Sequence, residues 1–165
     1  MNLTTAQLQA LKVWLTANAS GLNDEQSAAL LNAAASPAFT VWKTSVSIGK
    51  VGDNLVGTDL AGLSTLNHTR LQTVVTLSAG GVNPSLADRR AFFDDVFSGA
   101  GGTLTRAKLL ILWKRLATVG EKLFAVGTGT DVSPATLGMR VEGDATIYAE
   151  GAITIANVSE ARNQP

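Results

Sequence analysis

The stretch TTAQLQALKVWLTANASGLNDEQSAALLNAA, residues 4–34, decides the fold class. Thr4 with Gln7, and Asn23 with Gln26, each fit a capping box, in which two side chains three residues apart satisfy the free amides of a helix start. After each box, apolar residues recur at intervals of three and four, which is the period of a helix with one buried face. The stretch therefore predicts two consecutive helices.

The same signals predict more helices further along the chain. We expect a short one that opens at Ser36-Pro37 with Phe39 and Trp42 as anchors, and we expect residues 47–62, which contain four glycines, to form a loop. The remaining predicted helices run from Ser64 or Thr65 to Ser78 (with Leu66, Arg70, Val74 and Leu77 along one face), from Asn83-Pro84 (burying Leu86, Phe93, Val96 and Phe97), from Arg106 to Leu116, and from Thr118 to Val126.

The hydrophobic period changes from helical to alternating in the C-terminal part. Residues 146–149 and 152–155 read as two short strands, and Glu150-Gly151 between them suits a hairpin turn. Met139 and Val141 suggest a third strand, and residues 157–165 a frayed tail. The prediction is a mainly α protein: a bundle of five or six helices over residues 1–127, then a linker, a C-terminal β-hairpin appendage and a tail over residues 128–165.

Composition favours a subunit of a larger assembly. Hydrophobic residues make up 45% of the 165 residues and charged residues 16%, so the core can be large while the surface carries little charge. Residues 83–127 hold seven cations and four anions, whereas residues 128–165 hold two cations and five anions. We expect these segments to attract each other, within one chain or between copies.

The chain lacks the features of secreted and membrane proteins. It contains no cysteine, so it can form neither a disulfide framework nor a thiolate metal site. The start of the chain has no signal-peptide pattern, and the most apolar run, Leu109–Trp113, is too short to span a bilayer. We therefore expect synthesis in the cytoplasm and no membrane contact.

Candidate catalytic and ligand-binding residues are few. His68 has polar neighbours and no nucleophile motif, and Asp94 and Asp95 diverge by about 100° on a helix, which disfavours a cation site with Asp88 and Glu121. The glycine-rich runs near residues 100 and 128 lack the lysine of a phosphate loop. Lys108, Lys114 and Arg115 with Trp113 could suggest a helix that binds a membrane surface or nucleic acid, but Leu109, Leu112, Trp113 and Leu116 are more simply a core stripe flanked by solvated cations. We expect neither an enzyme nor a cofactor.

Two runs of sequence carry a resemblance to known proteins. The run GVNPSLADRRAFFDDVFSG, residues 81–99, and the segments LWKR, EKLFA and GTGTD between residues 112 and 131 resemble reading frames in the structural gene blocks of tailed bacteriophages. The layout of a small helical bundle with an appendage is similar to head–tail connector (adaptor) proteins. The resemblance implies a ring, twelvefold for a connector, between the portal and the tail or neck proteins. It also implies a place in the neck of the virion, DNA as the contents of the channel, and no catalysis.

The resulting hypothesis is a cyclic homo-oligomer in which the hairpin grips a neighbouring subunit. Pairing an exposed strand edge with another chain would satisfy its backbone groups. Alternatives are a capsid decoration, tail-terminator or tail-completion protein, or a small cytoplasmic phage regulator that reads DNA through residues 106–115. The predicted interface residues are Ile147, Tyr148, Ile153 and Ile155 of the hairpin, with the cations Arg89, Arg90, Lys114 and Arg115.

Overall fold

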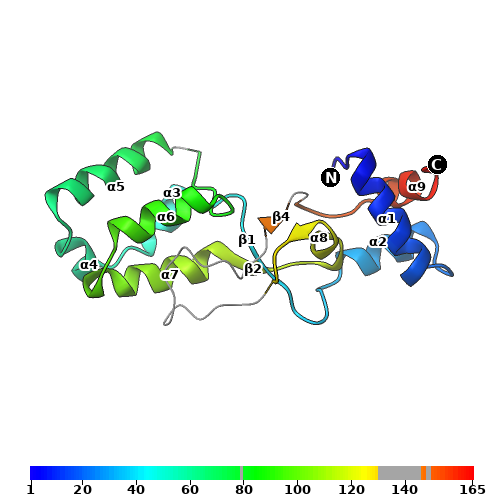
Figure 1. Cartoon of the computed structure of the whole chain (residues 1–165), viewed down its shortest axis with the longest axis horizontal. Coiled ribbons are helices and arrows are strands. Elements are labelled where there is room, and N and C mark those ends of the chain that lie inside the picture. Colours follow the sequence, from blue (N-terminus) through cyan, green and yellow to red (C-terminus); the bar gives the residue numbers. More distant parts are fainter. Residues whose placement is uncertain (79, 130–145, 148–149) are drawn as a thin grey trace. The chain divides into compact units, whose positions relative to one another are not determined.

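The computed structural model describes residues 1–78, 80–129, 146–147 and 150–165. Nine α-helices lie in these residues, and the structure is 58% helical (Figure 1). The prediction of a mainly α protein is confirmed, but the predicted number of five or six helices is too low.

The chain divides into two compact units. Unit 1 consists of Met1–Val41, Leu116–Gly129 and the described residues of Ala145–Pro165, and the described part of unit 2 is Trp42–Arg115. Unit 2 therefore interrupts unit 1 in the sequence. This division does not follow the predicted one, which placed a single helical bundle before residue 128, because the C-terminal residues pack against the N-terminal helices.

Unit 1 begins with the two helices that the opening stretch predicts. The amide of Gln7 donates to Thr4 Oγ1 at 3.3 Å and the amide of Thr4 donates to Gln7 Oε1 at 2.9 Å, and Asn23 and Gln26 form the second capping box. Both boxes are thus confirmed. The described elements of unit 1 are α1 (Thr5–Asn18), α2 (Asp24–Asn32), α8 (Val119–Leu123), α9 (Ile155–Arg162), β3 (Ala125–Val126) and β4 (Thr146–Ile147).

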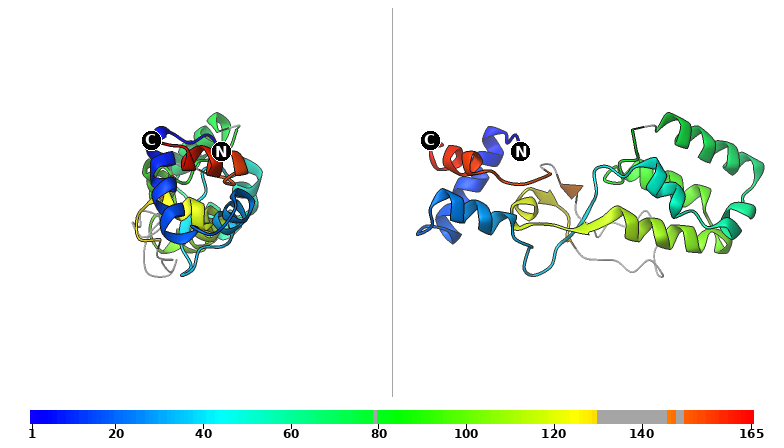
Figure 2. Two further views of the ribbon diagram at one scale, coloured as in Figure 1. Left: turned by 90° about the vertical axis from the view of Figure 1, so that its right-hand side faces the viewer. Right: turned by 180° about the vertical axis from the view of Figure 1, so that it is seen from behind.

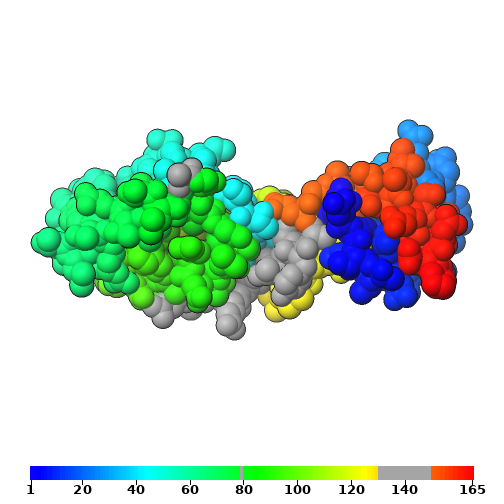
Figure 3. Space-filling model, turned by 90° about the horizontal axis from the view of Figure 1, so that it is seen from above, coloured from blue at the N-terminus to red at the C-terminus, as the bar shows by residue number. Residues whose placement is uncertain are grey.

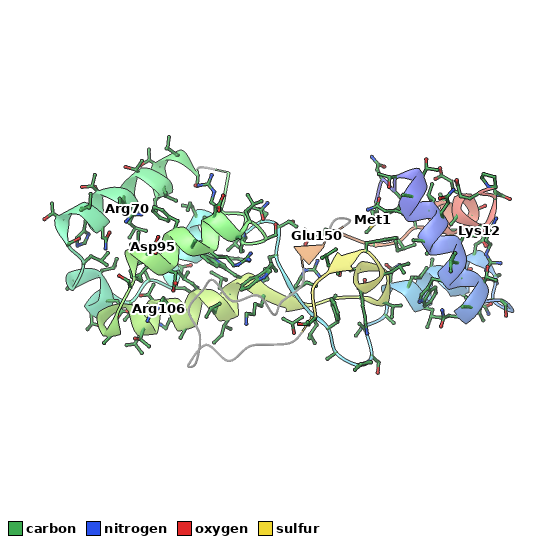
Figure 4. The ribbon with its side chains drawn as sticks, in the orientation of Figure 1. Met1, Lys12, Arg70, Asp95, Arg106 and Glu150 are labelled. Carbon is green, nitrogen blue, oxygen red and sulfur yellow. The ribbon has the colours of Figure 1, made fainter. Side chains whose placement is uncertain are left out.

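The C-terminal residues form a helix, not a frayed tail. Thr154 and Asn157 make a capping box at the start of α9, which packs on α1 and α2, so the two ends of the chain lie side by side in Figure 3. Val158 and Ala161 are fully buried beside Leu11 and Leu31. Lys12 on α1, labelled in Figure 4, donates to the carbonyl of Gln164. These contacts close the core of unit 1 with apolar residues from both chain ends.

The predicted C-terminal hairpin is wrong. β4 pairs antiparallel with β3, with Ala125 opposite Ile147 and Val126 opposite Thr146. Ile155, the end of the predicted second strand, is the first residue of α9. The remainder of the first predicted strand, Tyr148 and Ala149, lies outside the described residues, as does the proposed third strand at Met139 and Val141.

Unit 2 is a helical body in which the predicted loop is itself helical. Residues 47–62 contain α3 and α4, because Ser47 caps the amide of Lys50 and a second short turn follows. Ser64 caps α5 as predicted. The described helices of unit 2 are α3 (Ile48–Asp53), α4 (Gly57–Ala61), α5 (Thr65–Leu77), α6 (Ala87–Val96), η1 (Ala100–Gly102) and α7 (Thr103–Trp113).

The core of unit 2 is built around aromatic side chains. Phe93 of α6 meets Trp113 of α7 edge to face, with ring centroids 5.1 Å apart, and both are fully buried. Trp42, Val96, Phe97 and Leu109 complete the centre of this cluster. Burying each such side chain stabilises the fold by roughly 1.5–3 kcal/mol. The predicted burial of Phe93, Val96 and Phe97 is confirmed, whereas Leu86 is exposed.

Two short strands form where the sequence pattern predicts helix. Thr40–Trp42 forms β1 and Lys114–Leu116 forms β2, and the two strands pair. The expected helix after Pro37 is therefore absent from residues 37–47, and β2 separates α7 from α8. The amide of Lys43 donates to the carbonyl of Trp113 at 2.8 Å, and the amide of Ala117 donates to that of Phe39, also at 2.8 Å.

Candidate interaction surfaces

The predicted cationic interface residues differ in their exposure. Arg89 is exposed and Lys114 and Arg115 are half-buried, but Arg90 is buried. Arg90 Nη1 donates to the carbonyls of Pro84 and Ser85 at 2.7 and 3.0 Å, and its guanidinium lies 4.4 Å from the centroid of the Trp42 ring. Arg90 thus fixes the turn before α6 and packs on Trp42, which makes it unavailable to a neighbouring subunit.

Lys43 shows the electrostatic cost of this cationic region. Burial lowers the pKa of the Lys43 ammonium, and the positive charges of Lys50 and Arg115 lower it further. Its Nζ donates to the carbonyl of Leu112 at 2.5 Å. Lys114 Nζ lies 5.5 Å from the centroid of the Trp42 ring. Arg90 and Lys114 therefore both contact the Trp42 ring in unit 2.

Ile153 and Ile155 of the predicted hairpin differ in their exposure. Ile153 is fully buried in the core of unit 1, where a Cβ on Gly120 would lie 2.7 Å from its Cγ1. Asn32 fixes the backbone of Ile153 at both ends, since its Nδ2 donates to the carbonyl at 2.8 Å and its Oδ1 accepts from the amide at 2.9 Å. Ile155 is exposed at the start of α9. Ile147 lies in β4, and Tyr148 lies outside the described residues.

The sequence pattern did not predict the exposed apolar side chains of unit 2. Leu66 and Leu77 on α5 are 68% and 80% exposed, because the helix buries the side that holds Leu71 and leaves the line through Leu66 and Leu77 outside. On α7, Leu104 and Ile111 are 57% and 70% exposed, opposite the buried side that holds Leu109 and Trp113. The signal was present in the sequence, since α7 is apolar on nearly all sides and such a helix is normally buried.

A hollow in unit 1 offers a further surface of mixed character. Its volume is about 490 Å³, and Trp14, Ala35, Val119 and Leu123 supply its apolar lining. Its one charged lining residue is Lys122, whose Nζ lies 5.4 Å from the centroid of the Phe39 ring. A single charged side chain supplies no acid–base pair, so the hollow has the character of a contact surface.

The residues weighed for chemistry belong to several elements of the two units. His68 is exposed on α5, and Asp94 lies 3.9 Å from Arg106. Glu121 belongs to unit 1, where it accepts from the amides of Thr118 at 3.0 Å and Gly151 at 3.2 Å. Within the described residues, no group of three or more histidine or acidic side chains could hold a metal ion.

Comparison with family models, with curated proteins and with solved structures gave no match for this chain. Among the helices of the described residues, none is long and apolar enough to cross a membrane.

Proposed function

We propose that this protein is a structural subunit of a tailed-bacteriophage virion, and specifically a head–tail connector of the adaptor type. Copies of the chain form a ring, twelvefold for a connector, between the portal and the tail or neck proteins. DNA passes through the channel as its contents. The protein is made in the host cytoplasm and ends in the neck of the virion.

The observation that carries the proposal is the exposure of large apolar side chains on several helices. Leu77 on α5 and Ile111 on α7 are 80% and 70% exposed. Single exposed apolar residues are common, but a helix with apolar residues on two sides normally has a partner on each. The low charge of the chain supports the same interpretation, because copies of the free subunit then repel each other only weakly.

The phage setting is supported by the resemblance of the two sequence runs. The first run, residues 81–99, contains the whole of α6 with its buried Phe93 and Val96. The second crosses the end of α7, β2, α8 and β3. Residues 152–155 do not form the second strand of a hairpin. We therefore assign the contact between neighbouring subunits to exposed helix surfaces.

The test is the mass of the purified protein in solution, measured by light scattering after size exclusion. The protein is measured alone and after mixing with portal and neck proteins, and purified virions are analysed for the chain by mass spectrometry. A ring, formed alone or on the portal, together with presence in virions, is the expected result. Presence in virions without portal binding would instead favour a decoration, tail-terminator or tail-completion protein. Absence from virions would overturn the proposal and favour a regulator.

A further inference from the structure

The outer side of α5 is an apolar surface three turns long. Leu66, Thr69, Thr73 and Leu77 fall on one side of the helix, and we call them the α5 outer face. The hydroxyls of Thr69 and Thr73 donate to the carbonyls four residues earlier, at 3.1 and 2.9 Å. Because these hydroxyls bond within the helix, the threonines contribute chiefly methyl groups to the face.

The α5 outer face is also free of charge. The one Lys or Arg on α5 is Arg70, which Figure 4 shows on the side toward α6, and α5 contains no acidic residue. Its guanidinium lies 5.4 Å from the centroid of the Phe92 ring, and its Nη1 donates to Asn67 Oδ1 at 3.4 Å. By helix geometry Arg70 lies about 40° from Leu66, so it borders the α5 outer face, and a partner surface meets this one half-buried cation at the edge toward α6.

A second, shorter exposed surface lies on α7. Leu104, Lys108 and Ile111 fall on one side of this helix at positions i, i+4 and i+7, and we call them the α7 outer face. The opposite side of α7 is already occupied by the core of unit 2. The face places one cation between two exposed apolar side chains, and α5 and α7 lie on opposite sides of α6 (Figures 1 and 2).

Charge decides which surface each face can meet. Two copies of the α7 outer face would bring Lys108 close to its own copy, and like charges in a contact repel. The C-terminal end of α5 carries the partial negative charge of unbonded carbonyls and has no basic residue in its last turn. It therefore offers Lys108 acceptors beside Leu77, which in turn can pack against Leu104 and Ile111.

We infer that the α5 outer face of one copy binds the α7 outer face of the next copy. This contact joins two different patches of the subunit, which is a heterologous arrangement that forms a ring when its rotation closes. The inference rests on the part of the proposed function that holds that copies of the chain assemble. It adds the surfaces that join them.

The experiment uses three full-length variants, each with one new ammonium group at an exposed position, because a cation at Leu77 would face Lys108 and repel it. Leu77→Lys blocks the α5 outer face, Ile111→Lys blocks the α7 outer face, and Val13→Lys on α1 is the matched control. Circular dichroism checks that each variant is folded. Light scattering after size exclusion gives the mass at concentrations up to about 1 mM, where contacts worth about 4 kcal/mol form.

The expected result is that wild type and Val13→Lys associate while each of the other two variants alone does not. An ammonium group buried without a partner should weaken the contact roughly a hundredfold or more. A mixture of Leu77→Lys and Ile111→Lys should then form a dimer of twice the 17.1 kDa chain mass, since one variant keeps an intact α7 face and the other an intact α5 face.

Three outcomes would overturn the inference without deciding the proposed function. The first is association of both face variants to the same extent as Val13→Lys. The second is a dimer of Ile111→Lys alone, which would mean that α5 pairs with its own copy. The third is a wild-type protein that stays monomeric at every concentration. The virion and portal measurements described above judge the proposed function independently.

Discussion

At the residue scale, Lys43 makes a prediction about pH. Its ammonium has a lowered pKa, first because the side chain is partly buried and then because Lys50 and Arg115 lie close enough to repel it. Between this lowered pKa and the ordinary value of 10.5, the unfolded chain binds more protons than the folded chain. The contribution of Lys43 to stability must therefore rise as pH rises through this window.

The measurement is a ¹³C NMR titration of the lysine side chains. Lys43 should titrate below 10.5, and Lys50→Gln should raise its pKa by removing one of the repelling charges. Lys108→Gln is the control, since Lys108 is not among the causes of the shift. In urea unfolding, wild type should gain stability relative to Lys43→Met as pH rises through the window. A pKa for Lys43 at or above 10.5 would contradict the argument.

Asp59 makes a second prediction at this scale. Its carboxylate is buried, and Oδ2 accepts the amide of Thr105 at 2.7 Å, in the first turn of α7. The local N-cap, Gly102, has no side chain for this task. Asp59→Ala leaves that amide buried without an acceptor, so we expect a loss of about 1–3 kcal/mol in the free energy of unfolding by urea. Asp59→Asn keeps an acceptor oxygen and should lose less. A loss of under about 0.5 kcal/mol for Asp59→Ala would show that the bond contributes little.

At the element scale, the link between Asn32 and the segment before α9 is the feature to test. Asn32 satisfies both backbone groups of Ile153, as a neighbouring strand would. Asn32→Ala removes both bonds and should cost about 1–3 kcal/mol, with faster hydrogen exchange at the amide of Ile153. Asn163→Ala is the control, because its side chain bonds the carbonyl of Ser159 on the exposed surface. Unchanged exchange at Ile153 in Asn32→Ala would contradict this account.

The elements that the sequence predicted are those whose signals are local. In the capping boxes at Thr4 and Asn23 the two partners lie only three residues apart in the sequence, so both helices can be predicted from it. The box at Thr154 and Asn157 was missed, since Ile153 and Ile155 beside it match the alternation of a strand. The local pattern does not predict β1 for another reason. Its partner, β2, is remote in the sequence, and local propensity cannot predict a pairing between remote segments.

At the scale of the whole molecule, the division into units and the candidate surfaces were the least predictable features. Whether Leu66 and Leu77 face the core depends on which side of α5 meets α6, and the sequence offers two apolar lines on that helix. The same holds for Arg90, whose burial follows from its place over Trp42. Such choices are made by tertiary packing, so the exposed faces emerged from the structure and not from the hydrophobic pattern alone.

The last prediction separates two physical origins of assembly. The opposite charges of residues 83–127 and 128–165 suggest association through long-range attraction, which salt screens with a Debye length of about 10 Å at 0.1 M. The α5–α7 contact is instead apolar, with Lys108 at a helix end worth at most about 1 kcal/mol. Raising NaCl from about 0.05 to about 0.5 M should then weaken self-association by no more than about fivefold. Cooling should also weaken it, because hydrophobic association loses strength in the cold. Sedimentation equilibrium measures both dependences. A much steeper loss of association with salt would show that the oppositely charged segments make the contact.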